Sequence, residues 1–301
     1  MTGYYRHFYI LNLLFYILNF KKNPRKSVKS AKSAFHPPYI CAMNEQGKLY
    51  LIPSSMGEGA AIGLPQYAID VVHTLDTFIA ERAKTARRFL KEIATPVPFG
   101  KMIFYELNKH TEKDERETFL DNIFEGKNIG LLSEAGCPGV ADPGAKIVAM
   151  AHEMGVEVVP FVGPSSILLA LMAAGMNGQQ FAFTGYLPSK PEARVKALRR
   201  EENQSIAHNQ TRIFIETPYR NNHLIEDAIK HLSPYTRFCI AADLTLPTQF
   251  ISSKTIQEWR ENPPPDLHKR PAIFLIYNSS QKEYKAKSTQ VKKTNYKRQR
   301  R

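Results

Sequence analysis

Short apolar runs alternate with segments of helical periodicity along most of this chain. Up to residue 174, the pattern repeats regularly, and this alternation of strand and helix is typical of βαβ units. The first half is therefore predicted to form a mostly parallel sheet of five strands. The predicted strands lie at 48–52, 77–80, 101–106, 129–133 and 157–161, and the predicted helices at 64–75, 84–92, 114–124, 144–154 and 165–174.

A stretch rich in Gly, Asn and Gln at 175–180 has the composition of a linker. The strands predicted after it have short connections toward the end, which favours a mixed or antiparallel second sheet. We therefore expect an α/β fold of two domains, 43–176 and 177–278, with the active site in the cleft between them. The predicted strands of the second half lie at 180–184, 211–215, 237–242, 249–251 and 272–277, and the helices at 191–200 and 221–231.

The formal charge of +13 over 301 residues lies at the two ends of the chain. Residues 1–42 carry +7 and residues 279–301 carry +8, which leaves −2 on the body. The body is therefore not a basic nucleic-acid platform by composition, although the ends or a local patch still offer phosphate binding. The tail at 279–301 has almost nothing to bury and is predicted to be a disordered basic tail.

The leader at 1–42 is predicted to lie outside the folded core. Its apolar run at 8–20 is shorter than the roughly 20 residues that span a bilayer, and a basic run follows it, unlike a signal peptide. We interpret the leader as upstream translation, with Met43 as the true start. An amphipathic anchor at the membrane surface is the alternative; otherwise no membrane association is expected.

Three cysteines without a Cys-x-x-Cys spacing favour a reducing, cytoplasmic setting. Cys137 has no recognisable catalytic partner motif, so it is interpreted as a packing residue. No metal-binding motif occurs, and neither the Gly-x-Gly-x-x-Gly nor the P-loop pattern of nucleotide sites is present. The sequence therefore predicts no metal and disfavours nicotinamide and P-loop chemistry.

Four loops follow predicted strands of the first half, at 53–59, 81–85, 133–144 and 162–166. In a parallel sheet such loops meet at one edge, so they are expected to line a single pocket. Folding alone explains part of them: Asp142 with Pro143, and Ser165, are good helix caps. The remaining small residues of 133–144 let a ligand approach the backbone closely.

The same loops resemble the tetrapyrrole methylase superfamily, the class III S-adenosylmethionine methyltransferases, and most closely its branch of ribosomal RNA small-subunit methyltransferases. Ser133-Glu-Ala-Gly-Cys-Pro-Gly-Val-Ala-Asp-Pro-Gly resembles the Ser-Asp-Ala-Gly-Thr-Pro…Asp-Pro-Gly signature of that family. Four further segments match in order: Leu51-Ile-Pro-Ser-Ser-Met-Gly, Val159-Pro-Phe-Val-Gly-Pro-Ser-Ser, Phe183-Thr-Gly-Tyr-Leu-Pro-Ser-Lys and Phe214-Ile-Glu-Thr-Pro-Tyr-Arg.

The resemblance implies a homodimer that binds S-adenosylmethionine in the interdomain cleft and methylates a ribose 2′-hydroxyl of small-subunit ribosomal RNA. A ribose hydroxyl is a poor nucleophile, so a base would help, and the candidates are Glu81, His110 and Glu216. The residues expected to contact the methyl donor come from the matched loops. They are Pro53, Ser133, Glu134, Ala135, Gly136, Asp142, Pro143, Gly163, Pro164, Ser165, Ser166 and Leu187.

Three departures from the family leave the acceptor open. The loop Leu107-Asn-Lys-His-Thr only partly resembles the His-Asn-containing segment of the family. Where the RNA enzymes carry Glu-Asp-Thr-Arg, this chain has Glu81-Arg-Ala-Lys-Thr-Ala-Arg-Arg, and their small carboxyl-terminal domain is replaced by the basic tail. The basic helix around Lys84 and Arg87 is explained either by RNA or by a solvated face. Methylation of a tetrapyrrole or other small molecule, and donor binding without turnover on the ribosome, stay as alternatives.

Overall fold

The computed structural model describes residues 46–58, 63–107, 111–112, 116 and 118–279. The predictions for the leader at 1–42, and for the tail beyond residue 279, lie outside this part of the chain. Within it, no helix is both long and apolar enough to cross a membrane.

The first sheet is parallel throughout, where a mostly parallel sheet was predicted, and its strand order is β3-β2-β4-β1-β5. Strand β4 is flanked by β1 and β2, and its four residues are all buried. This position in the middle of the sheet matches its uninterrupted apolar sequence. The strands are β1 (Leu49–Ile52), β2 (Thr77–Ala80), β3 (Ile103–Glu106), β4 (Ile129–Leu132) and β5 (Val158–Pro160).

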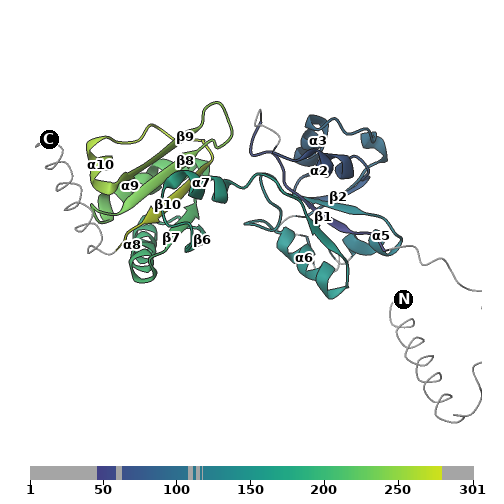
Figure 1. The fold of residues 1–301 in the computed structure, drawn as a ribbon, viewed down its shortest axis with the longest axis horizontal. Coiled ribbons are helices and arrows are strands. Elements are labelled where there is room, and N and C mark those ends of the chain that lie inside the picture. The colour runs from purple at the N-terminus through teal and green to yellow at the C-terminus, as the bar shows by residue number, and fades with distance from the viewer. Residues whose placement is uncertain (1–45, 59–62, 108–110, 113–115, 117, 280–301) are drawn as a thin grey trace, which may run out of the picture. The chain divides into compact units, whose positions relative to one another are not determined.

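Helices cover both faces of this sheet (Figure 1). On one face, α2 (Gln66–Val72) and α3 (Ala83–Glu92) bury residues such as Val72, Phe89 and Leu90 against the strands. On the other face, α5 (Asp121–Phe124) and α6 (Gly144–Glu153) contribute Ile123 and Ile147 to a separate cluster. The sheet is thus buried on both sides, as parallel strands require.

The second sheet is mixed, with strand order β6-β7-β10-β8-β9. Strand β6 runs parallel to β7, whereas β10 runs antiparallel to both of its neighbours, and β8 antiparallel to β9. This arrangement confirms the mixed sheet that the short late connections predicted. The strands are β6 (Phe181–Tyr186), β7 (Thr211–Ile215), β8 (Arg237–Ala242), β9 (Phe250–Thr255) and β10 (Ala272–Tyr277).

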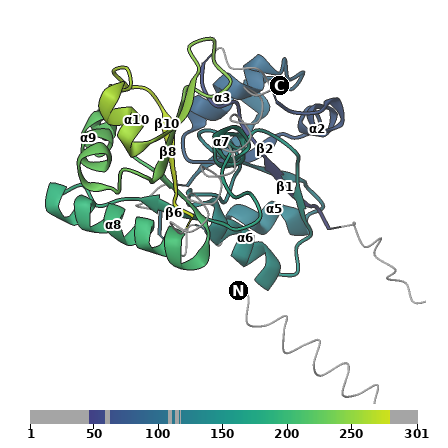
Figure 2. The ribbon, with the colours of Figure 1, turned by 60° about the vertical axis from the view of Figure 1, so that its left-hand side comes forward.

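Three helices, α8 (Pro191–His208), α9 (Asn221–His231) and α10 (Ile256–Glu261), pack on one face of the second sheet, and Figure 2 shows them grouped on that side. The other face is covered by α7 (Ser166–Ala174), whose Ala170, Leu171 and Ala174 pack against β7, β8 and β10. Helix α7 follows β5 of the first sheet, so the chain reaches the second sheet before the predicted linker. The domain limits 43–176 and 177–278 stay a prediction.

Several predicted element limits were wrong. The strand predicted from residue 101 begins at Ile103, because 99–101 form a 3-10 helix, and the helix predicted at 191–200 continues to His208. Helix α10 was missed because it has only six residues, although Thr255 and Glu258 form a capping box at its start. Helix α6 begins at Gly144, as predicted, but its N-cap position is Pro143 and not the expected Asp142.

Close packing around Gly130 leads to a stability prediction. A Cβ atom on this residue would lie 2.7 Å from Cδ1 of Ile52 and 2.8 Å from Cδ1 of Phe78. Gly130→Ala is therefore expected to lower the free energy of unfolding by about 1–3 kcal/mol through overpacking, measured by urea denaturation. Gly178→Ala is the control, since a Cβ added there would meet nothing within 4 Å, and it should change stability by less than about 0.5 kcal/mol. Equal stability of the two variants would contradict this packing.

Candidate active site

A cavity of about 410 Å³ is lined by loops at the edge of the first sheet where its strands end, and by residues at the edge of the second sheet where β6, β7 and β8 end. From the first sheet, all four predicted loops contribute, because parallel strands end at the same edge. Their cavity-lining members are Met56 after β1, Glu81 after β2, residues 133–137 and 140–142 after β4, and residues 165–167 after β5.

The second sheet supplies the rest of the lining from the edge where β6, β7 and β8 end. Strand β10 runs antiparallel to β7 and β8, so its first residues lie at this same edge, with Ala272 opposite Ala242 and Ile273 opposite Ile215. The cavity-lining residues from this sheet are Phe183, Tyr186, Ile215, Glu216, Pro218, Ala241, Asp243, Leu244, Pro271, Ala272 and Ile273.

Two loops of the first sheet are joined by a backbone bridge between Ser54 and Gly136. The Ser54 N–H donates to the Gly136 carbonyl at 2.9 Å, and the Gly136 N–H donates back to the Ser54 carbonyl at 3.1 Å. The two hydroxyls reinforce this bridge, because Ser54 donates to the Ser133 carbonyl and Ser133 donates to the Gly136 carbonyl. Ser133 and Gly136 therefore line the cavity as parts of a rigid loop.

Asp142 acts as the cap of this loop while it lines the cavity. Its Oδ1 accepts hydrogen bonds from the N–H groups of Gly139 at 2.7 Å and Gly144 at 2.8 Å, which fixes the start of α6. Between them the backbone is left-handed at Gly139 and Ala141, with φ of 78° and 61°. Burial raises the pKa of Asp142 more than the two hydrogen bonds lower it.

Ser165 caps α7, as predicted, because its side chain accepts a hydrogen bond from the N–H of Leu168. Cys137 contacts the same segment, and its thiol donates to the carbonyl of Pro164 at 3.4 Å. Burial raises the pKa of the Cys137 thiol, and a hydrogen bond with Ser165 lowers it by less. A thiol with a raised pKa is a poor nucleophile at neutral pH, in keeping with a packing role.

Glu134 connects the cavity to the start of α3. Its Oε2 accepts a hydrogen bond from the Thr85 hydroxyl at 3.1 Å and lies 4.0 Å from Nε of Arg82. Glu81 also lines the cavity and directly precedes Arg82. The loop after β2 and the loop after β4 therefore meet through these side chains.

Glu216 is more buried than Glu81, and its side chain is 0% exposed. Its Oε1 accepts hydrogen bonds from the Thr217 N–H and from Nε and Nη2 of Arg220, at 2.6, 2.9 and 2.5 Å. Among the described residues, Oε2 has no hydrogen-bond partner. A buried carboxylate oxygen without a donor is costly, so a ligand donor in this cavity would relieve it.

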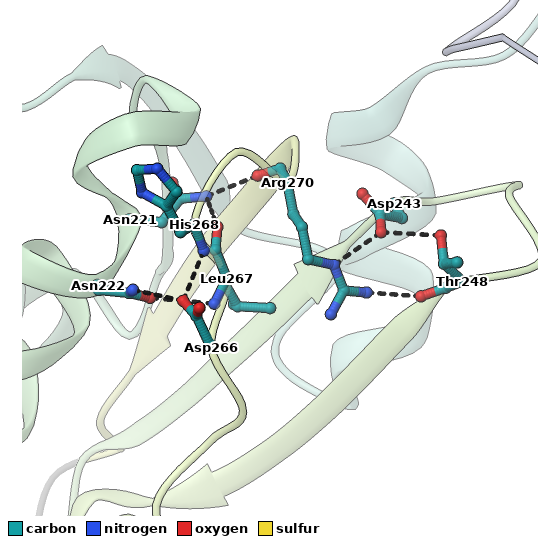
Figure 3. A network of polar contacts seen from close by, with 8 residues as sticks. All are labelled: Asn221, Asn222, Asp243, Thr248, Asp266, Leu267, His268 and Arg270. Carbon is teal, nitrogen blue, oxygen red and sulfur yellow. Dashed lines mark hydrogen bonds and ion pairs between the residues drawn. The ribbon is translucent and has the colours of Figure 1, made fainter.

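Asp243 holds the far wall of the cavity through the network in Figure 3. Its Oδ2 accepts from Nε of Arg270 at 2.7 Å and from the Thr248 hydroxyl at 2.9 Å, and Arg270 also donates to the Thr248 carbonyl. The amide of Asn221 donates to the carbonyls of Leu267 and Arg270, which fixes the segment leading into β10. The left-handed backbone of Asp243, with φ of 49°, is maintained by these contacts.

The cavity has an acidic lining. Five carboxylates line it, whereas no Lys, Arg or His is found among the described lining residues; the five are Glu81, Glu134, Asp142, Glu216 and Asp243. In the described ranges, no group of three or more His, Cys, Asp or Glu side chains is arranged to hold a metal ion. Glu216 and Asp243 are each paired with an arginine outside the lining, Arg220 and Arg270. The described lining itself presents only acidic charged groups, which suits a cationic organic ligand.

Most of the predicted site residues line this cavity: Glu81, Ser133, Glu134, Ala135, Gly136, Asp142, Ser165, Ser166 and Glu216. Five others do not, namely Pro53, Pro143, Gly163, Pro164 and Leu187. Gly163 packs closely on Pro53, and Leu187 belongs to the core of the second sheet. His110 lies outside the described residues. The donor-contact role of the whole set stays a prediction.

Asp243 and Tyr186 were missed by the sequence analysis. Both follow or end apolar strands of the second sheet, at the carboxyl ends of β8 and β6. The strand-end rule that selected the four loops of the first sheet would have selected them too, had the strand directions of the mixed sheet been known.

The two roles of Asp142, cap and cavity wall, separate in substitution experiments. Its pKa is raised above the ordinary 3.8, so the ionised carboxylate lowers stability once the pH exceeds that value. Asp142→Asn keeps the acceptor and removes the charge, so its free energy of unfolding at pH 7 should equal or exceed that of the wild type, with the difference vanishing below pH 3.8. Asp142→Ala loses both hydrogen bonds and should be less stable by about 1–3 kcal/mol.

Calorimetric titration with S-adenosylhomocysteine completes the Asp142 experiment. Because Oδ1 is engaged by the loop backbone, the dissociation constant of Asp142→Asn should stay within about threefold of the wild-type value. A loss of affinity of about tenfold, or 1.4 kcal/mol, in a folded Asp142→Asn protein would instead assign a direct ligand contact to this side chain.

Comparison with known proteins gives the same family as the loops. The model of the Tetrapyrrole (Corrin/Porphyrin) Methylases matches residues 48–259. A ribosomal RNA small subunit methyltransferase I from Escherichia coli O157:H7 is 33% identical over 217 residues, which cover 72% of each chain. The protein of the same name from Vibrio cholerae serotype O1 is 30% identical over 212 residues, 70% of this chain and 69% of the relative.

Solved structures share the fold. The methyltransferase CobJ superposes with a TM-score of 0.53 at 17% identity, covering 78% of this chain and 95% of its own. A cobalamin biosynthetic enzyme, the cobalt precorrin-4 methyltransferase CbiF, superposes with a TM-score of 0.50 at 15% identity, covering 76% and 94%. The chain therefore belongs to the tetrapyrrole (corrin/porphyrin) methylase family, as its motifs predicted, and is a methyltransferase that uses S-adenosylmethionine.

Proposed function

We propose that this protein transfers a methyl group from S-adenosylmethionine to a ribose 2′-hydroxyl of small-subunit ribosomal RNA. The observation that carries the proposal is the acidic cavity, with five carboxylates and no basic side chain among its described lining residues. The named relatives, which are ribosomal RNA small subunit methyltransferases, supply the acceptor class.

The residues of the cavity fit this donor. S-adenosylmethionine carries an activated methyl group on a cationic sulfonium. After methyl transfer, the sulfur of the product S-adenosylhomocysteine is a neutral thioether. Carboxylates in a partly enclosed cavity stabilise such a cation, and the rigid loop at 133–137 offers small side chains beside it. Alignment of the donor with the acceptor oxygen then supplies most of the rate.

Glu216 is our choice for the base. Its Oε1 is held by Arg220 and the Thr217 N–H, which leaves Oε2 as the oxygen that faces no donor among the described residues. The 2′-hydroxyl donates its proton toward this oxygen while the oxygen–methyl bond forms and the carbon–sulfur bond breaks. Glu81 is the second candidate, since it lines the same cavity. His110 is not placed by the described residues.

Tyr186 is suited to stack on the nucleobase of the acceptor nucleotide. It lines the cavity and is 59% exposed. The pairing of β6 with β7 shifts register between Phe183 and Tyr186, and Gly185 has the left-handed φ of 70° that the irregularity needs. An exposed aromatic ring beside a methyl-transfer cavity is a stacking surface for an unpaired nucleobase.

We further propose a homodimer in the cytoplasm, as the family resemblance and the reduced cysteines indicate. Sedimentation of the purified chain tests the dimer directly. A single species at the monomer mass would remove the second copy from the proposal and would leave the methyl-transfer chemistry unaffected.

The decisive experiment compares methylated nucleosides in ribosomal RNA from a deletion strain and its parent. The proposal expects one 2′-O-methylated nucleoside of the small subunit to disappear and to return on complementation. If every ribosomal RNA methylation persists, while the purified protein binds S-adenosylhomocysteine, the acceptor is a tetrapyrrole or another small molecule, or the protein binds the donor without turnover. Absence of S-adenosylhomocysteine binding would contradict all three hypotheses.

Glu216→Gln distinguishes a base from a donor contact. The amide cannot accept the hydroxyl proton, so methyl transfer to small subunits from the deletion strain should fall about 100-fold, while the affinity for S-adenosylhomocysteine stays within about threefold.

Glu81→Gln is the matched control for that experiment, because it makes the same chemical change at another cavity carboxylate. It should retain most of the activity. A larger loss in Glu81→Gln than in Glu216→Gln would assign the base to Glu81, and a parallel loss of donor affinity in Glu216→Gln would make Glu216 a donor contact.

A further inference from the structure

Helix α3 presents a strongly basic surface to solvent. Four exposed residues of the helix and the exposed residue directly before it are cationic, whereas Glu92 is the one exposed acidic residue of this segment. Lys84, Arg88 and Lys91 are spaced four and three residues apart, so they lie along one side of the helix. The full set, which we name the α3 cationic face, is Arg82, Lys84, Arg87, Arg88 and Lys91.

The opposite side of α3 is fixed in the core. Ala83, Ala86, Phe89 and Leu90 are buried, so the helix cannot rotate to hide its charges. Its first N–H, on Ala83, donates to Oε1 of Glu106 at 2.8 Å, which anchors its amino-terminal end to β3.

The cations of the face are poorly neutralised by the protein itself. Arg87 lies 4.6 Å above the ring of Phe104, a contact that fixes its direction without cancelling its charge. Arg82 and Arg88 each approach a carboxylate only at 4.0 Å, and both pairs are partly exposed. Exposed pairs of this kind are worth at most about 1 kcal/mol, so the face keeps a strong positive potential.

The α3 cationic face begins beside the candidate active site. Arg82 directly follows Glu81, which lines the cavity. One turn into the helix, Thr85 donates a hydrogen bond to Glu134, another cavity residue. A basic surface about 15 Å long, from the 1.5 Å rise of ten helical residues, therefore starts close to a cavity lined by carboxylates.

The acidic cavity does not itself favour binding of an RNA acceptor. An acidic cavity attracts a cationic donor and repels the phosphates of an RNA acceptor, and the body as a whole carries −2. The acceptor strand must therefore gain its affinity outside the cavity. Arginine and lysine side chains on a rigid helix beside the cavity suit phosphodiester groups, which they bind in a salt-dependent manner.

We propose that the α3 cationic face binds the phosphodiester backbone of the RNA strand next to the methylated nucleotide. The inference rests on the proposed function and specifies how that acceptor is held.

A triple variant, Lys84→Gln/Arg88→Gln/Lys91→Gln, tests the proposal. All three side chains are exposed, so the fold should persist. Binding of a fluorescent single-stranded RNA is measured from about 0.1 to 1 M salt. The logarithm of the binding constant falls linearly with the logarithm of the salt concentration, by about 0.7 per phosphate contact for single strands. Loss of three contacts should therefore reduce this slope by about 2. If the two proteins bind equally at 1 M salt, the variant should bind about 100-fold more weakly at 0.1 M.

The matched control removes three exposed cations elsewhere. Lys190→Gln/Lys196→Gln/Arg199→Gln changes the start and outer side of α8, on the second sheet. It makes the same change in net charge and should leave the RNA salt slope close to the wild-type value. An equal loss in both triple variants would reduce the effect to net charge and overturn the proposal.

Methylation assays separate this inference from the proposed function. With small subunits from the deletion strain, the α3 variant should show a raised KM, and its affinity for S-adenosylhomocysteine should be unchanged. If the wild type methylates small subunits and the α3 variant does so with the same KM, the proposed function stands and this inference fails. If the wild type methylates no RNA, the proposed function itself fails. Binding of the face to anionic vesicles but not to RNA would also overturn the inference.

Discussion

The site depends on the parallel pairing of β1 with β4 at the centre of the first sheet. Their register places Tyr50 opposite Gly130, and the missing side chain of Gly130 allows Ile52 and Phe78 to close over the strand. Because the two strands run in the same direction, the loops that follow them emerge together. The two-way backbone bridge between Ser54 and Gly136 then locks these loops to each other. Without this pairing, the residues of the signature loop would not share an edge with the other cavity loops.

The backbone around the cavity is left-handed at several residues, of which Ala141 and Asp243 carry a Cβ and are therefore strained. Left-handed residues occur on both sides of the cavity, at Gly136, Gly139 and Ala141 from the first sheet and at Asp243 from the second. Side chains hold these conformations: Asp142 caps its own loop, and Arg270 with Thr248 holds Asp243. Such preorganisation allows a methyl donor and an acceptor to be aligned without reorganisation of the protein during the reaction. It also explains why a cap such as Asp142 lies in the cavity wall.

Charge is separated on this protein in a way that suits two reactants of opposite sign. The described cavity lining is acidic, while the adjoining helix α3 is basic on its exposed side. An acidic site that attracts the cationic donor repels a polyanionic acceptor, and a basic site that attracts the acceptor repels the donor. The connection from Thr85 to Glu134 shows how closely these two surfaces approach. This separation of charge is the physical basis of the proposal that the cavity holds the donor and that α3 holds the acceptor strand.

Local sequence determined the strands, most helices and the family, because strand and helix periodicity and loop chemistry depend on neighbouring residues. It also indicated which loops of the parallel sheet meet, since all parallel strands end at one edge. The tertiary structure decided the rest. Strand β10 is antiparallel to β7 and β8, so Ala272 lines the cavity from the first position of a strand and not from the end of one. No local sequence pattern reveals this direction. Likewise the full burial of Glu216 is imposed by distant segments, whereas its contact with Arg220, four residues along the chain, is local.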